Sequence, residues 1–157
     1  MGNFGKSIPG GGIVTHAEGT LVDAYKPAHP GEELVMYAVG LGAVDAAVKT
    51  GAASPSPPVP ASGKPVLTFN FQPNAQPVPA TLAPFSPVTP LFAGLTPGFV
   101  GLYQINFVVP SPPSPLAPCV GDIGFVDLFG HVNTNLTVTV MGATSYDGAG
   151  ICVAPPQ

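Results

Sequence analysis

The clearest β-strand in this sequence is Leu102-Tyr103-Gln104-Ile105-Asn106-Phe107-Val108-Val109. Every second residue from Tyr103 onward is apolar and falls on one face of such a strand, whereas Gln104 and Asn106 fall on the other face. This alternation, in residues that favour β-structure, predicts a strand with one face on an apolar core, and Pro110 predicts its end. The chain is therefore expected to build a sheet that is apolar inside and polar outside.

Two further segments have strong strand character. Residues 135–140 place their aliphatic side chains inward and Thr137 and Thr139 outward. Residues 33–39 are apolar on both faces, which predicts an inner strand of a sheet. Weaker strands are predicted at residues 12–16, 20–24, 66–71, 78–82, 88–92, 123–128 and 150–153.

Turns and proline-rich loops separate these strands. Turn chemistry occurs at His29-Pro30-Gly31, Gly40-Leu41-Gly42, Thr96-Pro97-Gly98 and Asp147-Gly148. Residues 51–65 and 110–118 are loops rich in Pro, while residues 43–50 are the one candidate for a helical turn. The pattern predicts an all-β fold, an immunoglobulin-like β-sandwich of about 7–9 strands with long Pro-rich loops. One domain is expected over residues 12–157, preceded by a leader, linker or added segment at residues 1–11.

The composition excludes several classes of partner. Charged residues make up 8% of the chain, against about 25% in typical domains. The cations are four scattered lysines and the net charge is −4, so neither nucleic acid nor an anionic membrane surface is an expected partner. No apolar run reaches the length of a membrane span, and residues 1–12 lack the pattern of a signal peptide. A surface with so few charges is typical of secreted β-proteins.

Cys119 and Cys152 are the two cysteines of the chain. An even count in a sequence of secreted character predicts a disulfide between them, which would close a loop of about 33 residues and contribute roughly 3–4 kcal/mol. Two buried free thiols are the alternative. A catalytic cysteine would need a partner such as His131, and nothing in the sequence places that histidine nearby.

Other motifs favour structure over chemistry. Gly40-Leu41-Gly42 resembles the start of a dinucleotide-binding turn, but Asp45 stands where a third glycine is needed. His16, His29 and His131 lack metal-ligand spacing, and Asn135-Leu136-Thr137 matches a glycosylation site but lies inside a predicted strand. The eight acidic residues contain no calcium-loop pattern, although loops could still gather two or three of them. We predict no catalytic residue, no metal ligand and no cofactor.

Three segments together resemble a known family. They are Pro27–Glu32 running into Tyr37–Gly42, then Phe92–Asn106 with Val109-Pro110, and Asn135–Val138 running on to Ser145. They are similar to the uncharacterised Solibacter-type C-terminal domain, which closes large secreted proteins of acidobacteria. The resemblance covers about residues 12–154 and implies a β-sandwich at the end of a longer surface protein. It carries no catalytic residue across.

The expected function is that of a non-catalytic extracellular module, structural or adhesive, at the cell surface. Its partners would be neighbouring domains or like subunits, joined by strand addition from the stretch before His16 or the tail after Val153. The alternative is a carbohydrate-binding module or another binder of a cell-surface ligand, for which Gln104 and Asn106 form a candidate ligand face. Tyr25 and Tyr146 are candidate aromatic contacts, and a hydrolase is the third hypothesis.

Overall fold

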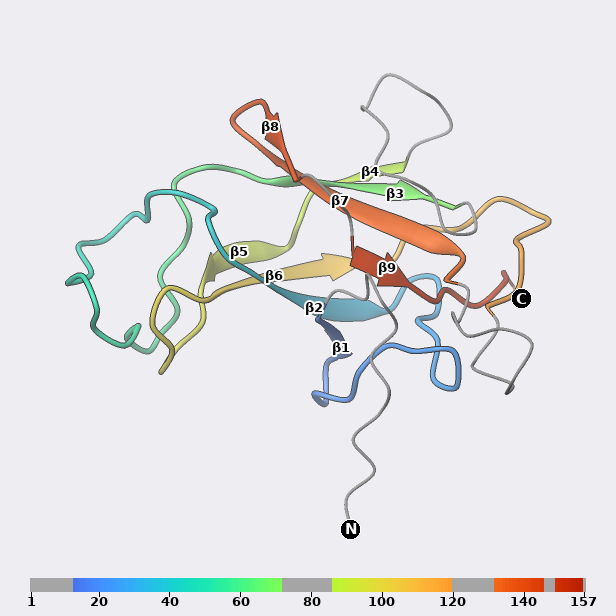
Figure 1. The fold of residues 1–157 in the computed structure, drawn as a ribbon, viewed down its shortest axis with the longest axis horizontal. Coiled ribbons are helices and arrows are strands. Elements are labelled where there is room, and N and C mark those ends of the chain that lie inside the picture. The colour runs from blue at the N-terminus through green and yellow to red at the C-terminus, as the bar shows by residue number, and fades with distance from the viewer. Residues whose placement is uncertain (1–12, 72–85, 120–131, 146–148, 157) are drawn as a thin grey trace, which may run out of the picture.

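The computed structural model describes residues 13–71, 86–119, 132–145 and 149–156. In these ranges the chain forms nine strands joined by turns and loops, with no helix and therefore none that could cross a membrane. The strands form two antiparallel sheets that lie over one another (Figure 1). The predicted all-β sandwich is confirmed.

The first sheet has the strand order β1-β2-β6-β5. Its strands are β1 (Val14–His16), β2 (Glu33–Ala38), β6 (Tyr103–Val108) and β5 (Phe92–Leu95). β2 lies between β1 and β6, as its two apolar faces predicted. In β6 the buried residues alternate with half-buried ones, so the two faces expected from the sequence are present.

The second sheet has the strand order β4-β3-β7-β8. Its strands are β4 (Ser86–Val88), β3 (Val66–Asn70), β7 (Thr134–Val140) and β8 (Ala143–Thr144). A further strand, β9 (Ala149–Ile151), pairs with the first half of β7, opposite β3. The strong strand predicted at residues 135–140 is thus the centre of this sheet.

Apolar side chains from both sheets fill the space between them. Phe69 of β3 and Phe107 of β6 meet edge to face with ring centroids 5.8 Å apart, and both rings are buried. Aromatic pairs of this geometry add about 0.5–1.5 kcal/mol to the stabilisation from burial. The other large, fully buried aliphatic side chains are Leu34, Leu67, Ile105, Leu136, Ile151, Val14, Val109 and Val153.

The outer face of the second sheet is polar, yet part of it is buried. Thr137 lies on the outer face as its position in the alternation predicted, but it is 7% exposed. It pairs with Thr68, and the neighbouring pair is Asn135 with Asn70, all of them buried. The alternation therefore predicted the face of these residues correctly but not their burial.

The helical turn predicted at residues 43–50 is wrong. The segment begins with a β-pairing instead: Val44 forms a β-bridge with Ala61, the Asp45 N–H donates to the Pro60 carbonyl over 2.9 Å, and a bend follows at residues 45–46. Eight residues are too few to form a stable helix without tertiary support. Pairing with residues 60–62 satisfies backbone groups of Ala43 and Asp45 that a helical turn would otherwise use, so the pairing is favoured over the helix.

The strand predicted at residues 88–92 is wrong in its boundaries. β4 ends at Val88 in one sheet and β5 begins at Phe92 in the other, so residues 89–91 cross between the layers. Pro90 lies in this crossing, where its missing N–H costs no ladder hydrogen bond. Of predicted strand 20–24 only Leu21 pairs, with Thr15. The strands predicted at 78–82 and 123–128 lie outside the described residues.

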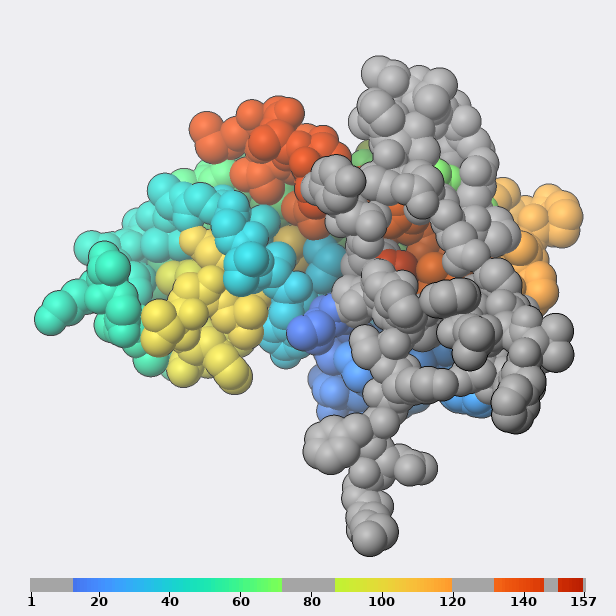
Figure 2. Space-filling view, in the orientation of Figure 1, coloured from blue at the N-terminus to red at the C-terminus, as the bar shows by residue number. Residues whose placement is uncertain are grey.

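The two proline-rich loops are confirmed, and the first one covers one end of the sandwich. Residues 39–65 run from β2 to β3 and meet the turn between β5 and β6 at the left of Figure 2. Ser54 joins the two segments: its N–H donates to the Phe99 carbonyl and its carbonyl accepts from the Gly98 N–H, both over 2.9 Å. This end of the molecule is therefore pinned by backbone hydrogen bonds.

Candidate ligand-binding face

Gln104 and Asn106 lie on the outer face of the first sheet because the residues between them point into the core. Tyr103, Ile105 and Phe107 are buried, while the two amides are half-buried. Antiparallel pairing places Tyr37 beside Gln104 and Val35 beside Asn106. The sheet therefore presents the two amides over its two central strands.

The amides form a hydrogen-bonded chain that ends on a carboxylate. Gln104 Nε2 donates to Asn106 Oδ1 over 3.2 Å, and Asn106 Nδ2 donates to Glu33 Oε1 over 3.3 Å. Because Glu33 is on β2, the chain links the two central strands across the surface. In the described part of the chain, these bonds use one N–H of each amide, so further donor and acceptor capacity remains.

An aromatic ring lies on each side of Gln104. Gly94 of β5 pairs with Gln104 on the side away from Tyr37. A Cβ atom at Gly94 would lie 2.2 Å from the Val59 carbonyl oxygen and 2.6 Å from Cζ of Phe92, so both the loop backbone and the tip of the Phe92 ring lie over this glycine. The row across three strands is therefore Phe92 over Gly94, then Gln104, then Tyr37. We call Tyr37, Phe92, Gly94, Gln104 and Asn106 the amide–aromatic face.

The amide–aromatic face is nearly neutral. Among the described residues that point outward from this sheet, Glu33 is the only charged one. Beside the Phe92 end lies an open cavity of about 330 Å³, whose lining includes Pro60, Pro65, Pro90, Leu91 and one cation, Lys64. The face can thus offer a ligand two amides that hydrogen-bond to hydroxyl groups and two apolar rings. It offers little electrostatic attraction to a charged ligand.

Tyr37, Phe92 and Glu33 were missed as candidates from the sequence. Tyr37 lies in a strand that is apolar on both faces, and the sequence places Phe92 at the end of a predicted strand, whereas it begins β5 after the crossing at residues 89–91. Their proximity to Gln104 depends on strand order and register, which the sequence does not display. Tyr25, predicted as an aromatic contact, is 81% exposed in a turn whose N–H groups are capped by Asp23. Tyr146 lies outside the described residues.

A buried histidine forms the second polar cluster of the chain. His16 Nδ1 lies 2.5 Å from Glu32 Oε1, and His16 Nε2 lies 3.2 Å from the Lys26 carbonyl. The second Glu32 oxygen accepts the His29 N–H over 2.8 Å. Burial acts to raise the pKa of Glu32, but the hydrogen bonds from His16 and His29 outweigh it and hold that pKa below its ordinary value. The cluster fastens β1 to the turn that precedes β2.

An exposed ion pair lies nearby. Lys26 Nζ donates to Glu18 Oε1 and to the Thr20 hydroxyl. Hydrogen bonds, the strongest from Lys26 and a weaker one from the Thr20 hydroxyl, lower the pKa of Glu18 to about 2. In the ranges that the structure describes, no group of three His, Cys, Asp or Glu side chains could hold a metal ion. His131 lies outside these ranges.

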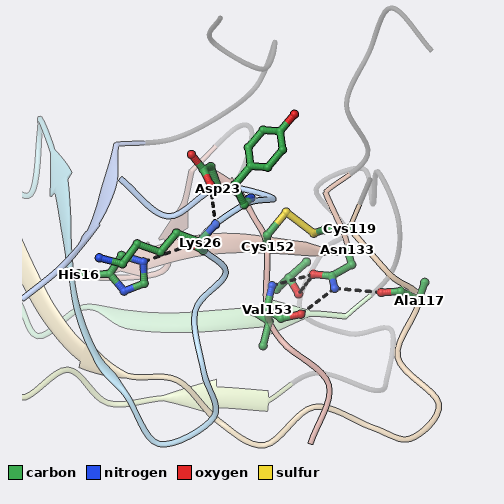
Figure 3. The surroundings of a disulfide bond; sticks show 10 residues. His16, Asp23, Lys26, Ala117, Cys119, Asn133, Cys152 and Val153 are labelled. Carbon is green, nitrogen blue, oxygen red and sulfur yellow. Dashed lines mark hydrogen bonds between the residues drawn. A yellow bond between two sulfur atoms is a disulfide. The ribbon is translucent and has the colours of Figure 1, made fainter. Parts of the chain in front are cut away.

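The cysteines form the predicted disulfide, Cys119–Cys152, with their Cα atoms 5.8 Å apart (Figure 3). The buried Asn133 side chain reinforces the same junction, since it bonds to residues near both cysteines. Its Nδ2 donates to the carbonyls of Ala117 and Val153, and its Oδ1 accepts the Val153 N–H over 3.0 Å. The disulfide and this amide together attach the segment after β6 to Cys152 and Val153, which directly follow β9.

The glycine-rich segment at residues 40–45 has a structural part. Gly40 and Gly42 adopt positive φ angles, and the Gly42 carbonyl accepts the Tyr103 hydroxyl over 2.5 Å. A dinucleotide site would need a helix to begin here, and residues 43–50 form none. Asn135, the first residue of the glycosylation motif, lies in β7 and is 4% exposed. The prediction that this motif is part of a strand is confirmed.

Comparison with known proteins adds no relative. No protein-family model matches this chain, and neither a curated protein nor a solved structure is similar to it. The assignment to the Solibacter-type family therefore stays a prediction.

Proposed function

We propose that this chain is a non-catalytic extracellular module with an adhesive or structural role in a larger secreted or surface protein. The observation that supports this most is the Cys119–Cys152 disulfide in a chain with very few charges. Disulfides persist in oxidising compartments and are rare in the cytosol, where thiols are kept reduced. The resemblance to the Solibacter-type domain supports the same location.

The strand order supports an immunoglobulin-like architecture for this module. If β1, β2, β5 and β6 are labelled A, B, D and E, the first sheet has the order A-B-E-D. If β3, β4, β7 and β9 are labelled C, C′, F and G, the second has the order C′-C-F-G, with the two-residue strand β8 as an addition beside the end of F. These are the orders of immunoglobulin sandwiches, an architecture shared by many cell-surface domains.

Three of the described sheet edges, those of β5, β1 and β4, favour adhesion through a face over assembly through an edge. The outer edge of β5 already pairs with Pro60, and the outer edge of β1 pairs with Leu21. Pro87 lies on β4, where proline discourages further pairing. Val14–His16 is a strand of its own sheet and Ala154 donates to the Ala28 carbonyl, so the described parts of both suggested donor segments contain residues already paired in this chain.

The compartment is tested on the full-length protein exported by its own host. Alkylation of intact protein, followed by mass spectrometry with and without reductant, should label Cys119 and Cys152 only after reduction. Free thiols in the exported protein would contradict the proposal. Sedimentation over a range of concentrations separates the modes of action: a monomer supports adhesion through a face, whereas concentration-dependent polymers support strand addition.

A further inference from the structure

We infer that the amide–aromatic face binds a neutral glycan chain, with its sugar rings lying flat on the sheet. The inference rests on the proposed extracellular function and names its ligand class. Three observations support it: two aromatic rings at a fixed spacing, amides between them, and outward residues of the described sheet strands that include no Lys or Arg, although Lys64 lines the cavity beside Phe92.

The spacing of the two rings follows from sheet geometry. Gly94, Gln104 and Tyr37 are paired neighbours on three adjacent strands. Strands in a sheet are about 4.8 Å apart, so the Phe92 ring over Gly94 stands about 10 Å from Tyr37, roughly the length of a disaccharide. The apolar C–H faces of two sugars in one chain could therefore each pack on one ring.

The amides between the rings match sugar hydroxyls. A hydroxyl both donates and accepts, and so does a carboxamide. Gln104 lies between the rings and Asn106 beside it, and their mutual hydrogen bond of 3.2 Å holds both amides in position. Glu33 Oε1 accepts from Asn106, which orients the chain of amides from its far end. Prepositioned polar groups flanked by apolar surface are the usual composition of a small-ligand site.

The charge of the face selects against anionic ligands. Phosphate, sulfate or uronate groups require Arg or Lys, and the described outward residues of this sheet include neither. A protein partner would cover the half-buried amides and would have to supply hydrogen bonds to each of them. A neutral polyhydroxylated chain satisfies both conditions.

Calorimetric titration of the intact chain with three neutral hexasaccharides, cellohexaose, xylohexaose and chitohexaose, tests the inference, with hexagalacturonate as the anionic comparison. We expect at least one neutral chain to bind, and Tyr37→Ala to weaken binding about tenfold because a packing surface is lost. Tyr37→Phe retains the ring and should bind as the wild type does. Val66→Ala, on the outer face of the other sheet, is the matched control and should change nothing.

Chemical-shift mapping of the backbone amides locates the site even if Tyr37→Ala folds poorly. Shifts should concentrate on β2, β5 and β6. The inference is overturned if no neutral chain binds at about 10 mM, a concentration that would reveal even millimolar affinity. It is equally overturned if hexagalacturonate binds as well as the neutral chains, or if the shifts map to β3 and β7. An oxidised cysteine pair with no glycan binding would leave the extracellular proposal intact and remove only this inference.

Discussion

At the scale of single residues, Gly94 shows how a missing side chain shapes the candidate site. A Cβ atom there would lie 2.2 Å from the Val59 carbonyl oxygen and 2.9 Å from Pro60 Cα. Both are backbone atoms and cannot move aside without displacing the loop that covers β5. The glycine therefore permits this loop and the Phe92 ring to approach the strand together.

We predict that Gly94→Ala lowers the free energy of unfolding by about 1–3 kcal/mol, as overpacking does elsewhere. Urea denaturation measures it. Gly63→Ala is the control, because its Cβ would meet mainly a side-chain atom, Cγ1 of Val140 at 2.9 Å, which can shift. Equal losses in the two variants would show that the loop is not held against Gly94.

A second prediction concerns acid stability and Glu32. Since the pKa of Glu32 is lower in the folded than in the unfolded chain, its carboxylate stabilises the fold above the unfolded pKa. That stabilisation should decline as the pH falls through the ordinary value of 4.5 and below it. In the Glu32→Gln variant, the denaturation midpoint should therefore fall less steeply than in the wild type as the pH is lowered through this range.

Glu18→Gln is the matched comparison for Glu32→Gln. Glu18 also has a lowered pKa, but its pair with Lys26 is exposed and screened by solvent. Surface pairs of this kind contribute little to stability. If Glu18→Gln flattens the acid profile as much as Glu32→Gln does, the part-buried contact between Glu32 and His16 is not the source of the effect.

At the scale of elements, the hairpin from β7 to β8 depends on two positive φ angles. Met141 has φ 49° and Gly142 has φ 83°, and the flanking residues Val140 and Ala143 pair directly. This is a two-residue turn of the type that favours Asn-Gly, because asparagine tolerates the left-handed conformation. Met141 is 91% exposed, so packing does not justify its presence.

Met141→Asn should therefore raise stability by about 0.5–1 kcal/mol. Thermal unfolding followed by circular dichroism measures the change. Met141→Ile is the opposite control, because a branched Cβ is strained at positive φ, and should lower the melting temperature. A lower melting temperature for Met141→Asn would mean that the Met141 side chain has an unrecognised contact.

At the scale of the whole molecule, the disulfide and Asn133 join segments that are far apart in sequence. Cys119 and Cys152 are separated by 33 residues, and Val153 bonds to Asn133. Ala28, in the loop between β1 and β2, also forms a β-bridge with Val153, so the segment that follows β9 contacts both Asn133 and this loop. Unfolding of this region should therefore involve the whole sandwich.

The double variant Cys119→Ala/Cys152→Ala should lose about 3–4 kcal/mol of stability on the chain-entropy argument. Guanidinium denaturation with and without reductant is the measurement. Reductant should destabilise the wild type to the same level and leave the double variant unchanged. If reduction does not shift the wild-type midpoint, the loop that the bond closes is already restricted in the unfolded chain.

Local chemistry in the sequence was enough to predict the three strong strands that became β2, β6 and β7, the turn at His29-Pro30-Gly31 and the disulfide. In β6 the alternation from Tyr103 to Val109 reports burial directly, because each residue of a strand has one of two faces. The segment at residues 43–50 failed because its hydrogen-bond partners lie 15 or more residues away. A sequence pattern read over a short window of residues cannot reveal hydrogen-bond partners that lie outside that window.

The amide–aromatic face shows the same division between pattern and assembly. Gln104 and Asn106 could be assigned to an outer surface from alternation alone, but Tyr37 and Phe92 could not be added. Their places beside Gln104 follow from β2 and β5 flanking β6 in antiparallel register, and the opening for the Phe92 ring follows from Gly94. Strand order and register are set by packing of the whole core, so the fold class was predictable here and the composition of the face was a product of tertiary structure.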